Sequence, residues 1–308
     1  MAKLTKEDIV AFADKYLKED NYAVVYKKQG KDPNEKKMTK PEITPIVSNR
    51  DVASPFLTSI QENAVKPIEP VFLDFKKDMS QLTAKSDIPV LYKQNTTNDL
   101  FQLIYVFDMG NNNDKALGTA FDYLEYLGTS DMTPEELKSE FYRLACTFYV
   151  SPGNERTYVV LSGLNENMPA AIQLFEKLLA DAQVNKEAYN NLVGDILKAR
   201  ADAKLNQGQN FSRLMNYAMY GPKSPATNLL TEAELASMNP QELVDRIHNQ
   251  NNYKHRILYY GPSSSKDLLA TIDQYHQVPA TLKDIPAGNE FSYLETPATK
   301  VLVAPYEA

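Results

Sequence analysis

The 308-residue chain contains no tryptophan, one cysteine and three histidines. A single thiol, Cys146, cannot form an internal disulfide, so a disulfide framework is excluded. Three scattered histidines leave little material for a zinc site built from the usual nitrogen and sulfur ligands. Hydrophobic residues make up 43% of the chain and charged residues 24%. This is the composition of an ordinary globular protein with one or two domains.

The chain also lacks a basic excess and a long apolar run. Lys and Arg number 33 against 40 Asp and Glu, for a formal net charge of −7. A general nucleic-acid-binding protein would carry a basic face, so nucleic acid is not an expected partner. No apolar run approaches the roughly 18 residues of a membrane-spanning helix. The first residues have no uninterrupted apolar segment of the kind found in a signal peptide.

The motifs of several common catalytic sites are absent as well. The sequence has no glycine-rich phosphate loop, no Cys-x-x-Cys pair and no Gly-x-Ser-x-Gly turn around a nucleophilic serine. His248, His255 and His276 lack a second ligand at metal spacing, so we expect each to be a surface or a hydrogen-bonded histidine. Cys146 is expected in the apolar core, because no histidine lies near it in the sequence to activate it.

Proline is present but unevenly distributed, and its distribution divides the chain. Seven of the 18 prolines lie in residues 31–90. Proline removes a backbone donor and favours extended geometry in the residue before it. Because long connectors without regular structure are uncommon inside one compact domain, we predict an extended interdomain linker over residues 31–85.

Both ends have the pattern of incomplete domains. Residues 1–30 are predicted to form a terminal helix, capped by Thr5, and a strand at 22–26 that together finish a preceding domain. Residues 287–308 contain an apolar strand pattern and are predicted to begin a following domain. We therefore expect a fragment of a longer protein; the alternative is that both ends pack on the central part.

Residues 86–286 are predicted to form one α+β domain, with an antiparallel sheet packed against helices. Two strands, 88–92 and 100–108, follow each other without an intervening helix, which favours antiparallel pairing. Further strands are predicted at 157–164 and 255–260. Helices are predicted at 114–127, from 133 through about 148, and at 166–182, 185–205, 208–219, 239–249 and 264–275.

One helical segment has the frame of a metal site. Zinc peptidases of the inverted type carry His-x-x-Glu-His on a helix, where both histidines bind zinc and the glutamate activates water. In this chain Asp122, Glu125 and Tyr126 occupy that frame, and Gly128-Thr129 follows closely. A core helix that keeps this spacing because it packs well is the simpler explanation of the segment taken alone.

With this frame, the segment resembles the zinc helix of the insulinase/pitrilysin family of metallopeptidases (inverzincins), with both histidines replaced. Other segments resemble the same family in the same order. Residues 151–164 resemble the strand after the second helix, 259–262 a strand end that closes a domain, and 41–74 the connector between the halves of a long bacterial member. Asp195 stands where a later helix of the family carries its third ligand, a glutamate.

The resemblance implies the place of this chain in a larger protein. Family members have four similar domains, paired into two halves that close around a peptide, with zinc in the first domain. This chain resembles the region around the non-catalytic, processing-peptidase-like third domain. The implied partners are the catalytic half of the parent polypeptide and a peptide substrate. Zinc is expected in the parent's N-terminal domain, and bacterial parents of this organisation are often exported.

The departures from the family pattern argue against catalysis here. Tyr126 is a poor zinc ligand at neutral pH, because a free tyrosine has a pKa of about 10. Two carboxylates without a nitrogen ligand do not form a catalytic zinc shell. The sequence therefore predicts no catalytic residue and no metal in this chain, with Asp122, Glu125, Tyr126 and Asp195 as vestigial zinc-site positions.

Several alternatives stay open from the sequence. The carboxylates at the replaced positions could form a weak site for a hard cation. The chain could be a catalytically inactive scaffold or protein-interaction subunit with the same fold. It could also be an unrelated α+β ligand-binding protein. If it binds a peptide, the expected mode is addition of an extended strand to a sheet edge, for which the strand at 100–108 is a candidate.

Overall fold

The computed structural model describes residues 4–18, 20, 22–27, 29–30, 39–44, 52–304 and 306. The chain divides into two units, Met1–Glu69 and Pro70–Ala308, and each is described by itself. The finer division predicted at residues 30, 85 and 286 stays a prediction. No helix in the described ranges is long and apolar enough to cross a bilayer.

The described residues of the first unit include the helices α1 (Lys6–Tyr16) and α2 (Pro55–Gln61). The predicted cap is confirmed, because Thr5 and Asp8 form a reciprocal capping box at the start of α1. The strand predicted at 22–26 is wrong, since residues 22–27 have no regular structure. A strand needs ladder hydrogen bonds from a neighbour, and the described part of the chain supplies none there. Helix α2 also interrupts the linker that was predicted to be extended throughout.

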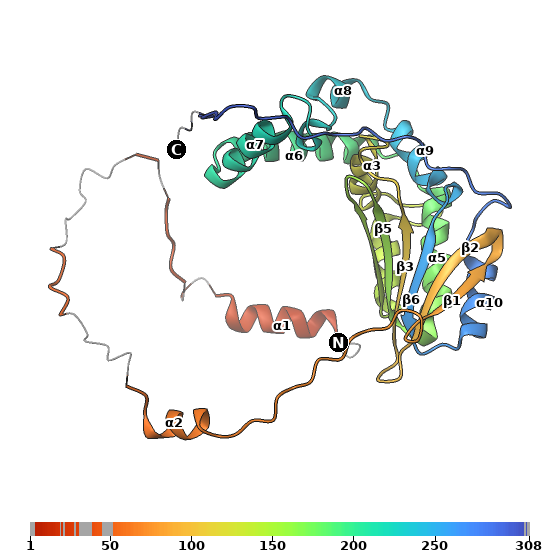
Figure 1. Cartoon of the computed structure of the whole chain (residues 1–308), viewed down its shortest axis with the longest axis horizontal. Coiled ribbons are helices and arrows are strands. Elements are labelled where there is room, and N and C mark those ends of the chain that lie inside the picture. The colour runs from red at the N-terminus through yellow and green to blue at the C-terminus, as the bar shows by residue number, and fades with distance from the viewer. Residues whose placement is uncertain are drawn as a thin grey trace. The chain divides into compact units, whose positions relative to one another are not determined.

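The second unit is built on one six-stranded sheet with the order β1-β2-β6-β3-β5-β4. Helices α3, α5, α9 and α10 gather on one side of it (Figure 1). The predicted α+β class, with strands packed against helices, is therefore confirmed. The strands are β1 (Ser80–Ala84), β2 (Ile88–Gln94), β3 (Leu100–Phe107), β4 (Cys146–Pro152), β5 (Thr157–Leu164) and β6 (Arg256–Gly261).

The sheet is mixed, and this corrects the predicted pairing of 88–92 with 100–108. Strand β6 lies between β2 and β3, parallel to β2 and antiparallel to β3. The Asn95 backbone N–H, just after β2, donates to the Gly261 carbonyl at 2.8 Å. The turn between β2 and β3 therefore continues the ladder with a strand formed much later in the chain. The remaining pairs, β1–β2, β3–β5 and β4–β5, are antiparallel.

Strand β4 was not predicted, because the helix starting near 133 was expected to run through Phe148. Thr133 and Glu136 form the predicted capping box, but the helix ends at Arg143. Ala145 follows with φ of +48°, a left-handed conformation that a right-handed helix does not contain. The chain then reverses, and Cys146 starts a strand. Cys146 is buried, as predicted, but it lies in a strand and not on a helix.

The eight helices of the second unit follow the predicted order, with one addition. Helix α8 was not predicted, and α9 begins at Gln241, two residues after the predicted start at 239. Their bounds are α3 (Leu117–Leu124), α4 (Pro134–Arg143), α5 (Met168–Asp181), α6 (Lys186–Lys204), α7 (Gln207–Tyr220), α8 (Glu232–Ser237), α9 (Gln241–Asn249) and α10 (Ser265–Tyr275). The main core lies between the helices and one face of the sheet, where Leu103, Leu161 and Phe175 are inaccessible to solvent.

Candidate functional site

The structure separates the predicted zinc-site frame into a helical part and a turn. Asp122 lies on α3 and is exposed, whereas α3 ends at Leu124 and Glu125 is its C-cap residue. Tyr126 follows in a tight turn, where its N–H donates to the Tyr123 carbonyl at 3.0 Å. Its side chain is 46% exposed. Asp122 and Tyr126 therefore do not share the regular helical face that two zinc ligands four residues apart require.

The carboxylates of the frame are exposed and uncompensated. Neighbouring protein atoms desolvate the Asp122 carboxyl, and the charge of Glu125 adds to this effect, so the pKa of Asp122 is raised even though the residue is solvent-exposed. Asp195, on α6, is also exposed. Across the described ranges, no three His, Cys, Asp or Glu side chains lie close enough together to hold a metal ion. The donor set of the frame thus does not fit zinc.

Packing explains the residues next to the frame, namely Tyr123, Gly128 and Thr129. Tyr123 is inaccessible to solvent, and its hydroxyl donates to the Asn185 carbonyl at 2.6 Å while accepting from the Asn185 N–H at 2.8 Å. A β-carbon at Gly128 would collide with the Met132 carbonyl oxygen. Thr129 closes the same turn, since its N–H donates to Met132 at 2.9 Å. These contacts give Tyr123, Gly128 and Thr129 a packing role that does not involve a metal ion.

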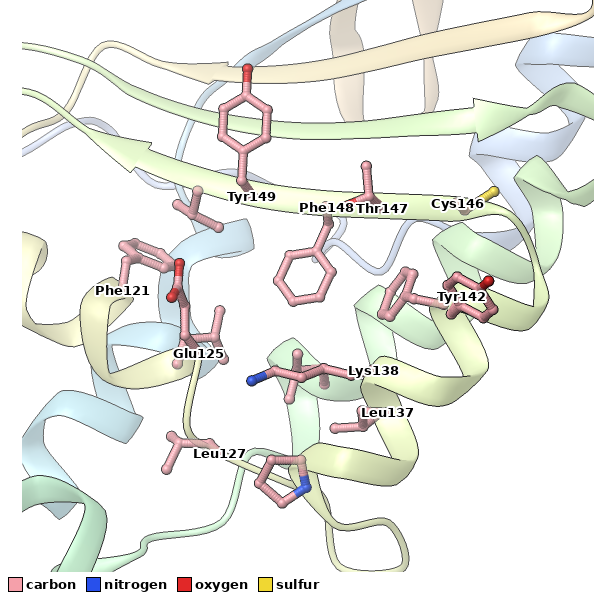
Figure 2. A pocket seen from close by; sticks show the side chains of 15 residues that line it. Phe121, Glu125, Leu127, Leu137, Lys138, Tyr142, Cys146, Thr147, Phe148 and Tyr149 are labelled. Atoms are coloured by element: carbon pink, nitrogen blue, oxygen red, sulfur yellow. The ribbon is translucent and has the colours of Figure 1, made fainter. Parts of the chain in front are cut away.

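A pocket of about 390 Å³ opens beside this frame, between α3, α4 and β4. Figure 2 shows Glu125 and Lys138 entering it from two different elements, with Phe148 pointing inward from β4. Sequence reasoning missed the pocket, because one of its walls is the unpredicted strand. Its lining is Phe121, Leu124, Glu125, Leu127, Pro134, Leu137, Lys138, Phe141, Tyr142, Cys146, Thr147, Phe148, Tyr149, Val150 and Leu178.

The pocket combines an aromatic floor with two charges at its rim. The Phe148 ring lies 4.8 Å from the Phe141 ring and 4.9 Å from the Phe175 ring, centroid to centroid. Glu125 and Lys138 are exposed, and neither is ion-paired within the described part of the chain. Such a site suits a large apolar group whose flanking atoms are polar or charged.

Strand β4 gives the pocket a hydrogen-bonding wall. Among the described strands it is an edge of the sheet and pairs with β5 alone. Five consecutive residues of β4, from 146 to 150, line the pocket. An exposed edge can add an extended peptide as a further strand. The earlier candidate for such an edge, the strand at 100–108, is wrong, because β3 lies between β5 and β6.

The sheet face opposite the helices carries a second apolar feature, which we call the open face. One row of cross-strand neighbours runs across it: Tyr149, Val160, Ile104, Leu258 and Leu91. Val160 is 3% exposed yet lies outside the helix-side core. Figure 2 shows Tyr149 and Phe148 on opposite sides of β4. Apolar side chains therefore lie on both faces of the sheet.

No protein-family model and no curated protein matches the chain. Solved structures do match it. The chain is similar to the periplasmic protease PqqL from Escherichia coli (TM-score 0.61, 15% identity, 94% of this chain and 30% of that one). It is also similar to a peptidase M16 inactive domain from Pseudomonas fluorescens (TM-score 0.57, 17% identity, 71% of this chain and 54% of that one).

A third similar structure is the ferredoxin protease FusC, solved in complex with Arabidopsis ferredoxin (TM-score 0.61, 11% identity, 95% of this chain and 30% of that one). The chain thus spans less than a third of PqqL and of FusC, and about half of the inactive-domain structure. At these identities the likeness concerns the fold. The chain has the fold of insulinase/pitrilysin-type peptidases, inactive domain included, as the sequence resemblance predicted.

Proposed function

We propose that this chain is a non-catalytic domain of a larger zinc metalloendopeptidase of the insulinase/pitrilysin type, and that it forms part of the chamber that encloses the peptide. Two observations support the proposal. The fold corresponds to a part of larger peptidases. Asp122 and Tyr126 offer no nitrogen ligand at the positions of the zinc frame, and helix α3 ends between them at Leu124. The catalytic half, and the zinc, belong to the rest of the parent polypeptide.

The observation that carries the proposal is the combination of a free strand edge with the pocket next to it. An extended peptide paired with β4 places every second side chain on the same face. One large apolar side chain then enters the pocket against Phe148. Neighbouring residues of the peptide reach Lys138 and Glu125 at the rim. The open face, with its row of apolar side chains, supplies a further wall for a bound peptide.

Peptide binding tests this proposal directly. We expect fluorescently labelled, unstructured peptides with one aromatic residue flanked by acidic residues to bind the chain, as measured by fluorescence anisotropy. Lys138→Glu should weaken binding roughly fivefold, the effect of about 1 kcal/mol from one partly exposed charge pair, and should favour peptides with basic flanks. The matched control is Lys198→Glu on α6, another exposed lysine on a helix. Equal effects of the two variants would exclude the pocket.

An inactive scaffold that binds a folded protein is the alternative, and helix α7 favours it. None of its residues is buried. Two of its large apolar side chains, Phe211 and Met215, are 62% and 43% exposed. Exposed large apolar side chains on one helix are typical of a protein-protein contact. A stoichiometric complex with a folded partner, in the absence of any peptide binding, would support the scaffold function.

Zinc content gives a separate test of the inactive site. After exchange into zinc-containing and then metal-free buffer, we expect the purified chain to retain far less than one zinc ion per molecule. The reason is that exposed carboxylates without imidazole or thiolate ligands bind zinc weakly. Elemental mass spectrometry measures the ratio. A ratio near one, lost in a variant with Asp122→Ala and Asp195→Ala, would instead indicate an unconventional metal site around Glu125.

A further inference from the structure

Three titratable side chains form a continuous chain in the interior of the second unit. Glu176 on α5, His276 at the end of α10 and His255 before β6 are 1%, 0% and 7% exposed. His276 Nδ1 lies 2.6 Å from Glu176 Oε1, and His276 Nε2 lies 2.9 Å from His255 Nε2. His255 Nδ1 lies 2.7 Å from the Tyr253 carbonyl oxygen. We call these three residues the buried relay.

The other carboxylate oxygen of Glu176 is also satisfied. Glu176 Oε2 accepts from Asn251 Nδ2 at 2.8 Å and from the Gln277 backbone N–H at 3.1 Å. Aromatic rings enclose the imidazoles: the Tyr105 ring centroid is 4.3 Å from that of His276, and the Phe107 ring centroid is 4.6 Å from that of His255. The relay is therefore enclosed by aromatic rings, and each of its polar atoms has a defined partner.

The partners determine where the protons lie. The Tyr253 carbonyl can only accept, so His255 Nδ1 carries a hydrogen. Neutral His255 then has a bare Nε2, which must accept from His276 Nε2–H. One further proton lies between His276 Nδ1 and Glu176 Oε1. Whether that proton resides on nitrogen or oxygen, the relay as a whole is neutral and every hydrogen bond is made.

An additional proton on His255 breaks the relay. Protonated His255 would present Nε2–H to the Nε2–H of His276, so that two donors face each other at 2.9 Å. Burial, and second the positive charge of His276, lower the pKa of His255 to about 4. The proton therefore binds in acid and not at neutral pH, at the cost of the contact between the two rings.

The charged groups around the relay are largely paired among themselves. Tyr105 on β3 has a pKa raised by burial and by the charge of Glu176, and Asp108 directly follows β3. Asp108 pairs with Arg256, and Lys254 pairs with Asp284. Asp87 lies before β2, and His248 on α9 lines the same pocket as Glu176. No carboxylate other than Glu176 bonds either imidazole of the relay within the described ranges.

Solvent reaches both ends of the relay. His255 lines a pocket of about 680 Å³, and Glu176 lines a separate pocket of about 270 Å³. Both pockets are bounded by residues of the segment 276–285, which leads out of α10 toward the C-terminal part of the chain. Protons thus have access to His255 without unfolding of the domain.

The relay also holds this segment in place. The Gln277 N–H donates to Glu176, and the Ser86 hydroxyl donates to the Pro279 carbonyl at 2.7 Å. Further along, Lys283 N–H donates to the Asn252 carbonyl at 2.7 Å, and Lys254 N–H donates to the Lys283 carbonyl at 2.9 Å. The segment is therefore attached near residues 252–255, next to the histidine that an extra proton would displace.

We propose that the buried relay is an acid-operated latch: a proton on His255 Nε2 breaks its bond to His276 and releases the segment 276–285 from the domain. At neutral pH the latch is closed, and the residues after α10 are held by their bonds to Glu176, Ser86 and the backbone of residues 252–254. Acid opens it and loosens the connection between this domain and whatever follows it. The latch depends on the relay geometry alone and does not rest on the proposed peptidase function.

Hydrogen exchange on the full 308-residue chain tests the latch. We expect the protection of peptides covering 276–285, corrected for intrinsic exchange, to fall at least tenfold between about pH 7 and about pH 4, while peptides of β5 stay protected. His255→Gln should abolish the fall, because its side-chain oxygen can still accept from His276 but cannot take a proton. His248→Gln, which changes the histidine outside the relay, should behave as wild type.

A measurement on the unaltered protein keeps the test independent of how the variants fold. Nitrogen chemical shifts of the three histidines at neutral pH should show His255 with hydrogen on Nδ1 alone, and its protonation should coincide with the loss of protection. Unchanged protection in acid, or the same loss in His255→Gln as in wild type, would falsify the latch.

Discussion

Replacing Glu176 by alanine is expected to destabilise the second unit by about 3–5 kcal/mol, the range for removing one partner of a buried charged pair. The change removes the partner of His276 Nδ1, of the Asn251 amide and of the Gln277 N–H, and both His276 and Asn251 are buried. It also leaves a cavity beside α5, where the Glu176 side chain was. Urea unfolding at about pH 7.5, followed by circular dichroism, measures the free energy of unfolding.

Two variants calibrate this result. Glu176→Gln should cost far less, because the glutamine amide can donate to His276 Nδ1 while its oxygen accepts from Asn251, so the relay stays complete and neutral. Glu140→Ala removes an exposed carboxylate that pairs with Arg143, and should change stability little. If Glu176→Ala cost no more than Glu140→Ala, the relay would not hold the interior together as described.

Gly163→Ala is expected to destabilise the domain by about 2–4 kcal/mol and to abolish peptide binding at β4. Gly163 lies on β5 with φ of +152°, and a β-carbon there would collide with the Ala145 carbonyl oxygen and lie 2.6 Å from Cys146 Cα. Both obstacles are backbone atoms, so they cannot move aside as a side chain would. The substitution therefore pushes β4 away from β5 at the point where the edge strand begins.

The same substitution at another glycine should have the opposite sign. Gly194 lies within α6, and a β-carbon there would meet nothing within 4 Å. Gly194→Ala should stabilise the domain by about 0.5–1 kcal/mol, because alanine has the higher helix propensity. Thermal unfolding of both variants and anisotropy with the same labelled peptide check the pair. Retention of peptide binding by a folded Gly163→Ala variant would contradict the placement of the site on β4.

The sequence predicted most of the helices because their signals are local. Thr133 and Glu136 lie three residues apart and form the capping box expected from their identities. The strand at 157–164 was also predicted, and it contains the consecutive buried residues Val159, Val160 and Leu161. Strand β4 was not, because the residues after Arg143 continue an apolar pattern that suits either structure. The left-handed conformation of Ala145 ends the helix and allows β4 to begin, and an alanine gives no local sequence signal for that conformation.

Part of the candidate site could likewise be predicted from residue identity, and part depends on the tertiary structure. That Asp122, Glu125 and Tyr126 cannot supply a zinc ion with nitrogen ligands follows from their side chains alone. The pocket beside them depends on α3, α4 and β4 meeting in space. Its two rim charges, Glu125 and Lys138, are 13 residues apart on different elements, a separation at which the sequence carries no signal of a shared site.

By itself, the sequence determined the α+β class, the capping boxes at Thr5 and Thr133 and the absence of nitrogen ligands at Asp122 and Tyr126, because each is a property of residue identity within a few positions. Only the tertiary structure decided that β6 enters between β2 and β3, that β4 is the free edge, and that Glu176 meets His276 across 100 residues. Such contacts arise when distant elements bury their apolar faces together, and the polar groups carried with them must then find partners in the interior.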